Sequence, residues 1–348
     1  MNIGTQTDNR PILGISVGDP GGIGPEITAK ALNDREIYTR SRPLVVADYR
    51  TMQDALNFSN VALKLNSVVN VADGIYEYGT MDILDMKNMA REYLQHKKVT
   101  AEQGHASFEY VAKVIELAMN GEIHGTVTGP INKAAIHAAG HQFAGHTEIF
   151  ATLTHTRDYC MMLAHGDFRV SHVSTHVSLR EACDRVKQDR IIRVINLTYE
   201  ALKKVSASEP KIGVAGLNPH CGEGGLFGHE DDNEILPAVE KAVRNGKNVE
   251  GPIPADTIFS KMKGGMYDAV VVMYHDQGHI PTKLIGFQYD EQTGQWGAMS
   301  GVNVTLGLPI VRTSVDHGTA FGKAGEGRAN PQSMVEAIKL GALLAKKT

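Results

Sequence analysis

PILGISVGDPGGIGPEITAKAL, residues Pro11–Leu32, joins a strand, a glycine-rich turn and a helix without interruption. The apolar run Pro11–Val17 predicts the strand, and Pro25–Leu32 predicts the helix because proline is favoured in a first helical turn. A strand that passes directly into a helix begins a βαβ unit, so this stretch favours an α/β fold.

The same alternation continues along the chain. Pro43–Ala47 predicts a second strand, and helical spacing of apolar residues predicts helices over 100–120, over 188–205 and after Asn330-Pro331. Three further strands are predicted at Phe168–Val173, Lys211–Leu217 and Tyr267–Met273. Strands and helices in this order imply a largely parallel sheet covered by helices on both faces.

The chain length predicts two α/β domains. At 348 residues the chain exceeds the size at which single cores usually stop growing. Glycine and proline punctuation places the divisions near Gly129 and Gly301. The expected domains are therefore 1–129 plus 301–348, and 130–300.

The composition and charge limit the classes of binding partner and the cellular compartment that we expect. The net charge of -4 and the pI near 6.4 provide no basic field for nucleic acid. The three cysteines are widely spaced, and neither a signal core nor a membrane-spanning apolar run is found. We expect a cytoplasmic protein without nucleic-acid or membrane partners.

The turn Gly18–Glu26 occupies the position of a phosphate-binding loop. It lacks the third glycine of the dinucleotide fingerprint, so a Rossmann site is not indicated. The alternative is a tight turn that leads the chain into the helix. Asp19 and Glu26 would then be helix-cap and first-turn charges.

Three histidines indicate a metal site. His176, His220 and His275 each follow one of the three predicted strands, in segments rich in Gly, Pro and Asp. The carboxyl end of a sheet is where open α/β folds place their ligands. A lone histidine after a strand is usually a surface or core residue, but three in this position favour metal binding.

A second group of residues suits an anion. Gly145-His146-Thr147-Glu148 predicts the start of a helix capped by Thr147, and helix amino termini bind phosphate or carboxylate. Lys283, Asn303 and Arg312 lie in Gly- and Pro-flanked segments further on. Arginine matches a pair of anionic oxygens, and lysine supplies a point charge. For each charge alone, a solvated surface position is the alternative.

These motifs together resemble the 4-hydroxythreonine-4-phosphate dehydrogenases of pyridoxal phosphate biosynthesis and their D-threonate/D-erythronate 4-phosphate dehydrogenase paralogues. The resemblance runs from Gly18-Asp19-Pro20 to Asp316-His317-Gly318-Thr319-Ala320. Between them lie Thr128-Gly129-Pro130, Gly145-His146-Thr147-Glu148, Gly216-Leu217-Asn218-Pro219-His220, Gly251-Pro252-Ile253-Pro254-Ala255-Asp256 and Met273-Tyr274-His275-Asp276-Gln277-Gly278. The motifs occur in order over nearly the full length.

The resemblance implies a fold like that of isocitrate and isopropylmalate dehydrogenases, with two α/β/α domains and a cleft at a homodimer interface. It implies a divalent cation, zinc, cobalt, magnesium or manganese, bound by His176, His220 and His275, with ligands shared between two subunits. It assigns the phosphorylated substrate to five residues: His146, Thr147, Lys283, Asn303 and Arg312. It also implies NAD or NADP, bound without a Rossmann fingerprint at residues that the sequence does not identify.

The implied reaction is an oxidative decarboxylation. A cation that binds the substrate hydroxyl favours hydride departure to the nicotinamide, and it stabilises the enolate formed when carbon dioxide leaves. Lys283 or Asp256 is the candidate acid/base group, and Asp256 and Asp276 are candidates for orienting histidines. Asp256 could instead cap a helix that begins at Thr257.

The substrate is the open question. The first expectation is the vitamin-pathway substrate 4-phosphooxy-L-threonine, which gives 3-amino-2-oxopropyl phosphate. The alternative is a paralogue substrate, D-threonate or D-erythronate 4-phosphate, which gives dihydroxyacetone phosphate. A related branch oxidises cis-dihydrodiol carboxylates. The segment Gln288–Ser300, with the only tryptophan, Trp296, is longer than in the vitamin-pathway enzymes. It is either a neutral surface loop or a change in the pocket. From other classes, a metal-dependent lyase or hydrolase without nicotinamide and a noncatalytic binding protein stay open.

Overall fold

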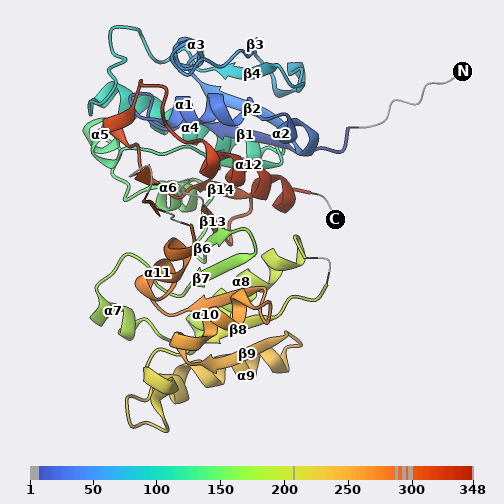
Figure 1. The fold of residues 1–348 in the computed structure, drawn as a ribbon, viewed down its shortest axis with the longest axis vertical. Helices are drawn as coiled ribbons and strands as arrows, with labels where there is room; N and C mark the ends of the chain where they lie inside the picture. The colour runs from blue at the N-terminus through green and yellow to red at the C-terminus, as the bar shows by residue number, and fades with distance from the viewer. Residues whose placement is uncertain (1–7, 207, 287–288, 292–294, 297–300, 347–348) are drawn as a thin grey trace, which may run out of the picture. The chain divides into compact units, whose positions relative to one another are not determined.

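The computed structural model describes residues 8–206, 208–286, 289–291, 295–296 and 301–346. The chain divides into two compact units, Met1–Ile149 with His317–Thr348, and Phe150–Asp316. The sequence placed these divisions near Gly129 and Gly301. Strands and helices alternate in both units, so the predicted α/β class is confirmed (Figure 1).

The first unit is built on five parallel strands in the order β3-β4-β2-β1-β5. They are β1 (Ile12–Ser16), β2 (Arg42–Ala47), β3 (Lys64–Val68), β4 (Thr80–Asp85) and β5 (Gly125–Thr128). Its helices are α1 (Gly24–Ala31), α2 (Arg35–Arg40), α3 (Tyr49–Phe58), α4 (Ala101–Met119), α5 (Lys133–Ala138) and α12 (Gln332–Leu344), with short 3-10 turns at Val71–Asp73 and Phe321–Lys323. The predicted strands at 11–17 and 43–47 are confirmed, as are the helices at 25–32, 100–120 and the carboxyl end.

The main sheet of the second unit has, in the described residues, the strand order β14-β13-β6-β7-β10-β8-β9. They are β6 (Cys160–His165), β7 (Phe168–His172), β8 (Ile212–Ala215), β9 (Val249–Ile253), β10 (Ala269–Val272), β13 (Val302–Leu306) and β14 (Arg312–Val315). β7, β10, β8 and β9 are parallel, whereas β6, β13 and β14 pair antiparallel. The three strands predicted before the histidines, now β7, β8 and β10, are confirmed.

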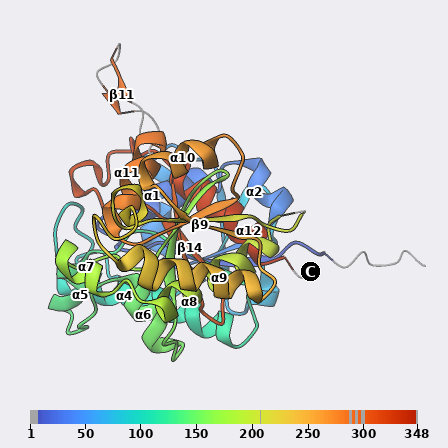
Figure 2. The same ribbon diagram turned by 90° about the horizontal axis from the view of Figure 1, so that it is seen from below.

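Helices cover both faces of the parallel part of the second unit. They are α7 (Leu179–Asp184), α8 (Gln188–Lys203), α9 (Leu236–Arg244), α10 (Ala255–Lys263) and α11 (His275–Gly286), with a 3-10 turn at Pro219–Gly222 and a π-turn at Asp231–Ile235. Figure 2 shows α10 and α11 on one side of β9, and α8 and α9 on the other. Phe168, Val270 and Ile258 belong to the core between the strands and α10.

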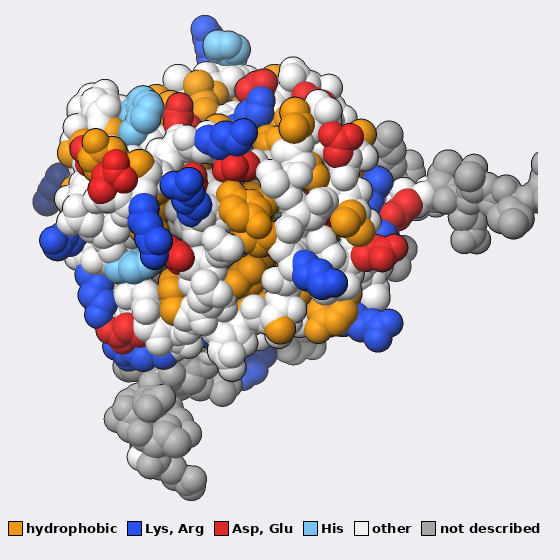
Figure 3. Space-filling view, turned by 90° about the horizontal axis from the view of Figure 1, so that it is seen from above, with side chains coloured by type: hydrophobic (Ala, Val, Ile, Leu, Met, Phe, Trp, Pro, Cys, Tyr) orange, Lys and Arg blue, Asp and Glu red, His pale blue; other side chains and the backbone are white. Residues whose placement is uncertain are grey.

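The described residues also include a short hairpin and a helix at the division between the units. Within the predicted insertion Gln288–Ser300, β11 (Tyr289–Asp290) pairs antiparallel with β12 (Gln295–Trp296), and the rest lies outside the described residues. Helix α6 (His146–Leu153) runs across the division between the units. In the described part of the chain, no helix is long and apolar enough to cross a membrane. Acidic and basic side chains are interspersed on the face drawn in Figure 3.

The turn after β1 is held by close backbone approaches. Gly18 has φ +79°, and a Cβ at Gly24 would lie 1.8 Å from the carbonyl oxygen of Val17. Neither position can accept another residue without moving the backbone. Asp19 and Glu26 are fully buried, and Glu26 accepts hydrogen bonds from Ala329 N at 2.6 Å and from Lys30 Nζ at 2.8 Å. Glu26 is a first-turn charge of α1, as expected, but Ile23 occupies the N-cap position, so the expectation that Asp19 caps this helix is wrong.

The burial of Asp19 predicts a pH-dependent stability. Burial raises the pKa of Asp19 to about 6, although Gly21 N donates to its Oδ1 at 2.8 Å. The folded state therefore binds this proton more tightly than the unfolded state, and stability falls as pH rises from about 4 to 6. We expect Asp19→Asn to match the wild type near pH 4 and to exceed its free energy of unfolding at pH 8 by up to about 3 kcal/mol. Urea unfolding at the two pH values measures this, and a difference that does not widen with pH contradicts it.

Candidate functional site

The structure brings two of the three predicted metal histidines together. β7 and β10 are parallel neighbours with His172 opposite Val272, so their carboxyl ends meet at one edge. His176 lies in the loop after β7, and His275 begins α11 after β10. Their ring centroids are 5.6 Å apart at an interplanar angle of 48°. Two imidazoles this close can contribute to one ligand set.

His220 lies in a different environment, on the turn after β8. Its side chain is 66% exposed, and it contacts Glu223 and the edge of the Phe227 ring. Among the residues that the structure describes, no group of three or more His, Cys, Asp or Glu side chains is arranged to hold a metal ion. Donor chemistry therefore fits a divalent cation at His176 and His275, while one described chain does not complete the predicted set.

The backbone that carries His220 is strained and firmly anchored. His220 and Cys221 have φ of +51° and +57°, values that cost free energy for residues other than glycine. The fully buried carboxylate of Asp231 accepts from Leu217 N at 2.9 Å and from Asn218 N at 3.1 Å. This anchor fixes the entry to the turn and offsets the strain. Asp231 was not predicted, because no known sequence motif places an aspartate at this distance from His220.

Carboxylates orient two of the imidazoles. His275 Nδ1 lies 2.6 Å from Asp276 Oδ1, and His220 Nδ1 lies 3.3 Å from Glu223 Oε2. A histidine whose Nδ1–H donates to a carboxylate presents its Nε2 to a metal, and both contacts suit this arrangement. Asp276 therefore lies where the sequence predicted a histidine-orienting group. Glu223 was missed, and its spacing of three residues from His220 was the available signal.

Asp256 is exposed in the first turn of α10. The helix begins at Ala255 after Pro254, so the alternative that Asp256 caps a helix beginning at Thr257 is wrong. Burial, then the charges of Asp231 and Asp256, raises the pKa of Cys221 to about 11. The Asp256 charge thus acts on Cys221, the residue after His220. Asp256 therefore stays a candidate for orienting His220 or for moving a proton.

Two further histidines, missed by the sequence analysis, extend the row at His275. The His279 ring stacks on the His275 ring at 3.6 Å and 11°, and His279 Nδ1 donates to the His275 carbonyl oxygen at 2.9 Å. His172 is buried, with its ring 4.8 Å from that of His279. Burial, followed by smaller charge effects that include those of the neighbouring histidines, lowers the pKa of His279 to about 4 and that of His172 to about 3. Both rings are therefore neutral at pH 7 and pack beside His275 without added charge.

Asn303 and Arg312 lie on one face of the β13–β14 ladder. Asn303 pairs with Ser314 and Val304 with Thr313, so Thr305 and Arg312 form the next pair on the Asn303 side. Arg312 Nη1 donates to Thr305 Oγ1 at 2.8 Å, and its guanidinium lies over the Phe150 ring. Burial lowers the pKa of Arg312 to about 9. A cation in such an interior position favours an anionic ligand.

Lys283 is the third predicted substrate residue of the second unit. It lies on α11, and its Nζ forms an ion pair with Asp316 Oδ2 at 2.9 Å. Asp316 directly follows β14. Asp316 opens the motif Asp316–Ala320, and the sequence predicted no role for it.

His146 and Thr147 lie in the first turn of α6. The helix begins at His146, so Thr147 is inside the first turn and the prediction that it caps the helix is wrong. Glu148 accepts from Ala144 N instead. Both predicted residues are partly exposed at a helix amino terminus, where backbone N–H groups favour an anion.

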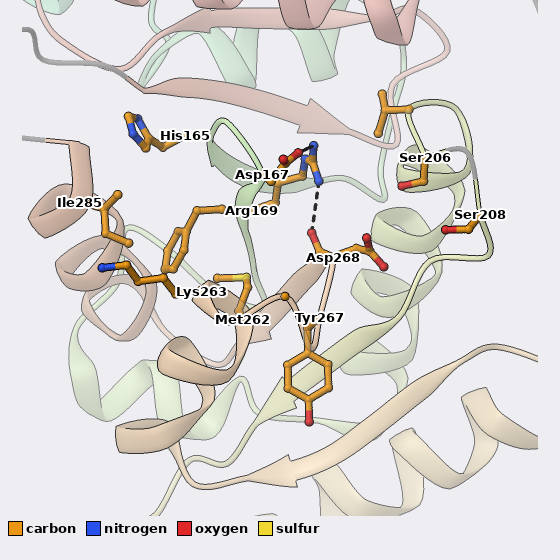
Figure 4. Close-up of a pocket in the computed structure, with 13 residues that line it drawn as sticks. His165, Asp167, Arg169, Ser206, Ser208, Met262, Lys263, Tyr267, Asp268 and Ile285 are labelled. Atoms are coloured by element: carbon orange, nitrogen blue, oxygen red, sulfur yellow. Dashed lines mark hydrogen bonds and ion pairs between the residues drawn. The ribbon is translucent and has the colours of Figure 1, made fainter.

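A cavity of about 610 Å³ lies elsewhere in the second unit (Figure 4). Its lining includes Phe168 and Arg169 at the start of β7, and Tyr267 and Asp268 just before β10. These are the amino ends of the strands, whereas His176 and His275 follow the carboxyl ends. The cavity is therefore separate from the histidine pair.

Comparisons with known proteins identify relatives over the full length. A protein from Symbiobacterium thermophilum, named "Putative D-threonate 4-phosphate dehydrogenase", is 46% identical over 97% of this chain and 98% of its own. The crystal structure of a 4-hydroxythreonine-4-phosphate dehydrogenase from Burkholderia phymatum is 39% identical, covers 98% of this chain and 100% of its own, and has a TM-score of 0.85. The structure of a terephthalate 1,2-cis-dihydrodiol dehydrogenase from Burkholderia xenovorans is 29% identical, covers 96% and 98%, and has a TM-score of 0.68.

The family itself is matched over most of the chain. The sequence model described as "Pyridoxal phosphate biosynthetic protein PdxA" matches residues 39–341. Two of these relatives share 46% and 39% identity with this chain, and both alignments cover 97% or more of each of the two proteins compared. The resemblance drawn from the sequence motifs is thereby confirmed, and the chain belongs to the PdxA family.

Proposed function

We propose that the protein is a metal- and NAD(P)-dependent dehydrogenase that oxidatively decarboxylates a four-carbon hydroxy acid carrying a phosphate. The adjacent rings of His176 and His275 carry this proposal, since they offer two imidazole nitrogen ligands at the carboxyl ends of β7 and β10. Membership of a family whose relatives are named dehydrogenases supports the reaction class.

The substrate that we place first is D-threonate 4-phosphate, or its erythronate isomer. The relatives named for D-threonate 4-phosphate reach 46% identity, whereas the structure named for 4-hydroxythreonine 4-phosphate reaches 39%. The sequence motifs alone had favoured 4-phosphooxy-L-threonine, which becomes the second candidate. The dihydrodiol branch ranks third at 29% identity.

Residues of this chain supply binding and orientation. Arg312 and Asn303, on one ladder face, and Lys283 would hold anionic oxygens of the substrate, with His146 and Thr147 as further phosphate contacts. Asp276 holds the His275 ring so that its Nε2 remains available. A bound cation would supply Lewis acidity toward the substrate hydroxyl, and NAD or NADP would accept the hydride. Lys283 and Asp256 both stay candidates for moving the proton.

We further propose a homodimer in which His220 completes the ligand set of its partner. Exposed apolar side chains lie close in sequence to each predicted metal histidine. They are Leu179 after His176, Leu226 and Phe227 after His220, and Ile280 and Leu284 on α11 after His275. Clusters of exposed apolar side chains usually mark interfaces. The separation of His220 from the His176–His275 pair agrees with ligands drawn from two chains.

A panel assay tests the function. Purified protein with Zn²⁺, Co²⁺, Mg²⁺ or Mn²⁺ is mixed with NAD or NADP, and absorbance at 340 nm is followed with D-threonate 4-phosphate, D-erythronate 4-phosphate, 4-phosphooxy-L-threonine and a cis-dihydrodiol carboxylate. We expect the highest kcat/KM with one of the sugar-acid phosphates. Product formation without absorbance change would favour the metal-dependent lyase, and absence of any reaction would favour a binding protein.

The dimer predicts the behaviour of Leu226→Glu. Leu226 is 72% exposed on the loop of His220, so a carboxylate there would be desolvated in an interface. We expect the dimer dissociation constant to rise at least about tenfold, which corresponds to only about 1.4 kcal/mol. Light scattering over a dilution series measures it. Val69→Glu, at an 84% exposed apolar site of the first unit, is the control and leaves the mass unchanged. A monomeric wild type, or a dimer insensitive to Leu226→Glu, contradicts the proposal.

A further inference from the structure

Asp316 shares a ladder face with the predicted anion-binding residues. Val302 lies opposite Val315, and a Cβ at Gly301 would lie 3.5 Å from Asp316, so the register continues one pair beyond the strands. Side chains alternate across a ladder, so Asp316 falls on the same face as Arg312 and Asn303. The Arg312–Thr305 hydrogen bond confirms that this face is shared across the two strands.

Lys283 reaches this face from the helix that begins with a metal histidine. His275, His279 and Lys283 are spaced by four residues and therefore line one side of α11. His279 stacks on His275 and donates to its carbonyl oxygen, which fixes the helical turn that precedes Lys283. Asp316 then binds the end of the lysine side chain at 2.9 Å.

A free lysine ammonium at this position would sample many orientations, because four side-chain torsions separate it from the helix. The Lys283 and Asp316 side chains are 36% and 18% exposed, so the pair is not an ordinary solvated surface contact. It joins α11 to the end of β14, whereas many ion pairs of this chain join residues four apart on one helix.

We propose that Asp316 is a positioning residue that holds the Lys283 ammonium against the β13–β14 ladder, where it converges with Asn303 and Arg312 on one anionic group of the substrate. The inference rests on the proposed function for its substrate. Asp316 touches no reacting atom and acts through Lys283.

The sign of the effect of Asp316→Asn on KM separates positioning from simple electrostatics. If the carboxylate were only a negative neighbour of the substrate, its removal would lower KM for an anion. If it positions Lys283, we expect KM to rise about tenfold with kcat changed less than about twofold, the pattern of lost uniform binding. A KM that falls or stays constant overturns the inference.

A double-mutant cycle tests whether Asp316 acts through Lys283. In a Lys283→Met background, Asp316→Asn is expected to change KM less than about twofold, because the group that it positions is gone. Equal effects of Asp316→Asn in both backgrounds overturn the inference. Glu250→Gln, which breaks the Lys211–Glu250 pair at 2.9 Å, is the matched control and leaves KM unchanged.

A readout independent of turnover keeps this inference separate from the proposed function. Trace acetylation at pH 8, with peptide mass spectrometry, measures the reactivity of Lys283 against Lys211 as an internal reference. Asp316→Asn is expected to raise Lys283 labelling at least threefold, since the carboxylate no longer holds the ammonium. Unchanged labelling overturns the positioning whatever the substrate. If labelling rises but the wild type turns over no compound of the panel, the positioning stands and the proposed function fails.

Discussion

The His275→Ala variant is expected to lose the divalent cation of the proposed function and about 10³-fold or more of its kcat/KM. His275 starts α11, contacts His176 and is oriented by Asp276 at 2.6 Å. Groups that merely orient a metal ligand contribute about 10- to 100-fold to metal affinity, so removal of a ligand costs more. Metal content by mass spectrometry and turnover with saturating metal measure the two losses.

A graded series sharpens this prediction. Asp276→Asn keeps the imidazole and is expected to weaken metal binding by about 10- to 100-fold. His105→Ala removes an imidazole from the exposed side of α4 and serves as the control. Full metal content in His275→Ala, or equal losses in His105→Ala, would show that the metal is bound elsewhere.

Much of the fold could be predicted from the sequence because local patterns decide it. The apolar runs at β1, β2, β7, β8 and β10 and the helical spacing in α4 and α8 gave the right element type. These signals depend on residues close in the chain. The antiparallel strands β6, β13 and β14 were not predicted. β6 pairs with its neighbour β7, and β13 with its neighbour β14, but the pairing of β6 with β13 joins distant segments and leaves no local pattern.

The site was predictable only where a residue follows a strand. His176 and His275 were singled out because each follows a predicted strand. The structure brings them together because β7 and β10 are adjacent and parallel, so both strands end at one edge. The roles of Glu223, Asp231, His279 and Asp316 depend on contacts that the chain makes after folding, so no spacing rule reveals them. Thr147 was assigned to a helix cap, and a cap was the alternative for Asp256. Both assignments are wrong because a shift of one residue in the helix start changes a cap into a first-turn residue.

Replacement of Arg312 by methionine is expected to weaken binding of the substrate. Arg312 is 2% exposed, and burial lowers its pKa to about 9. A cation in a buried position interacts strongly with a bound anion, because little water screens the pair. Loss of one partner of a buried charge pair typically costs 2 to 5 kcal/mol, so KM for the phosphorylated substrate should rise at least about 30-fold.

The matched control for Arg312→Met is Arg190→Met. Burial also lowers the pKa of Arg190, but Arg190 donates to the carbonyl oxygens of Val173 and Tyr159, each at 3.0 Å. Its replacement leaves two carbonyl groups unsatisfied, so the melting temperature should fall while KM stays constant. Scanning calorimetry measures the melting temperature of each variant, and steady-state kinetics measures its KM. An unchanged KM for Arg312→Met would make Arg312 a structural cation like Arg190.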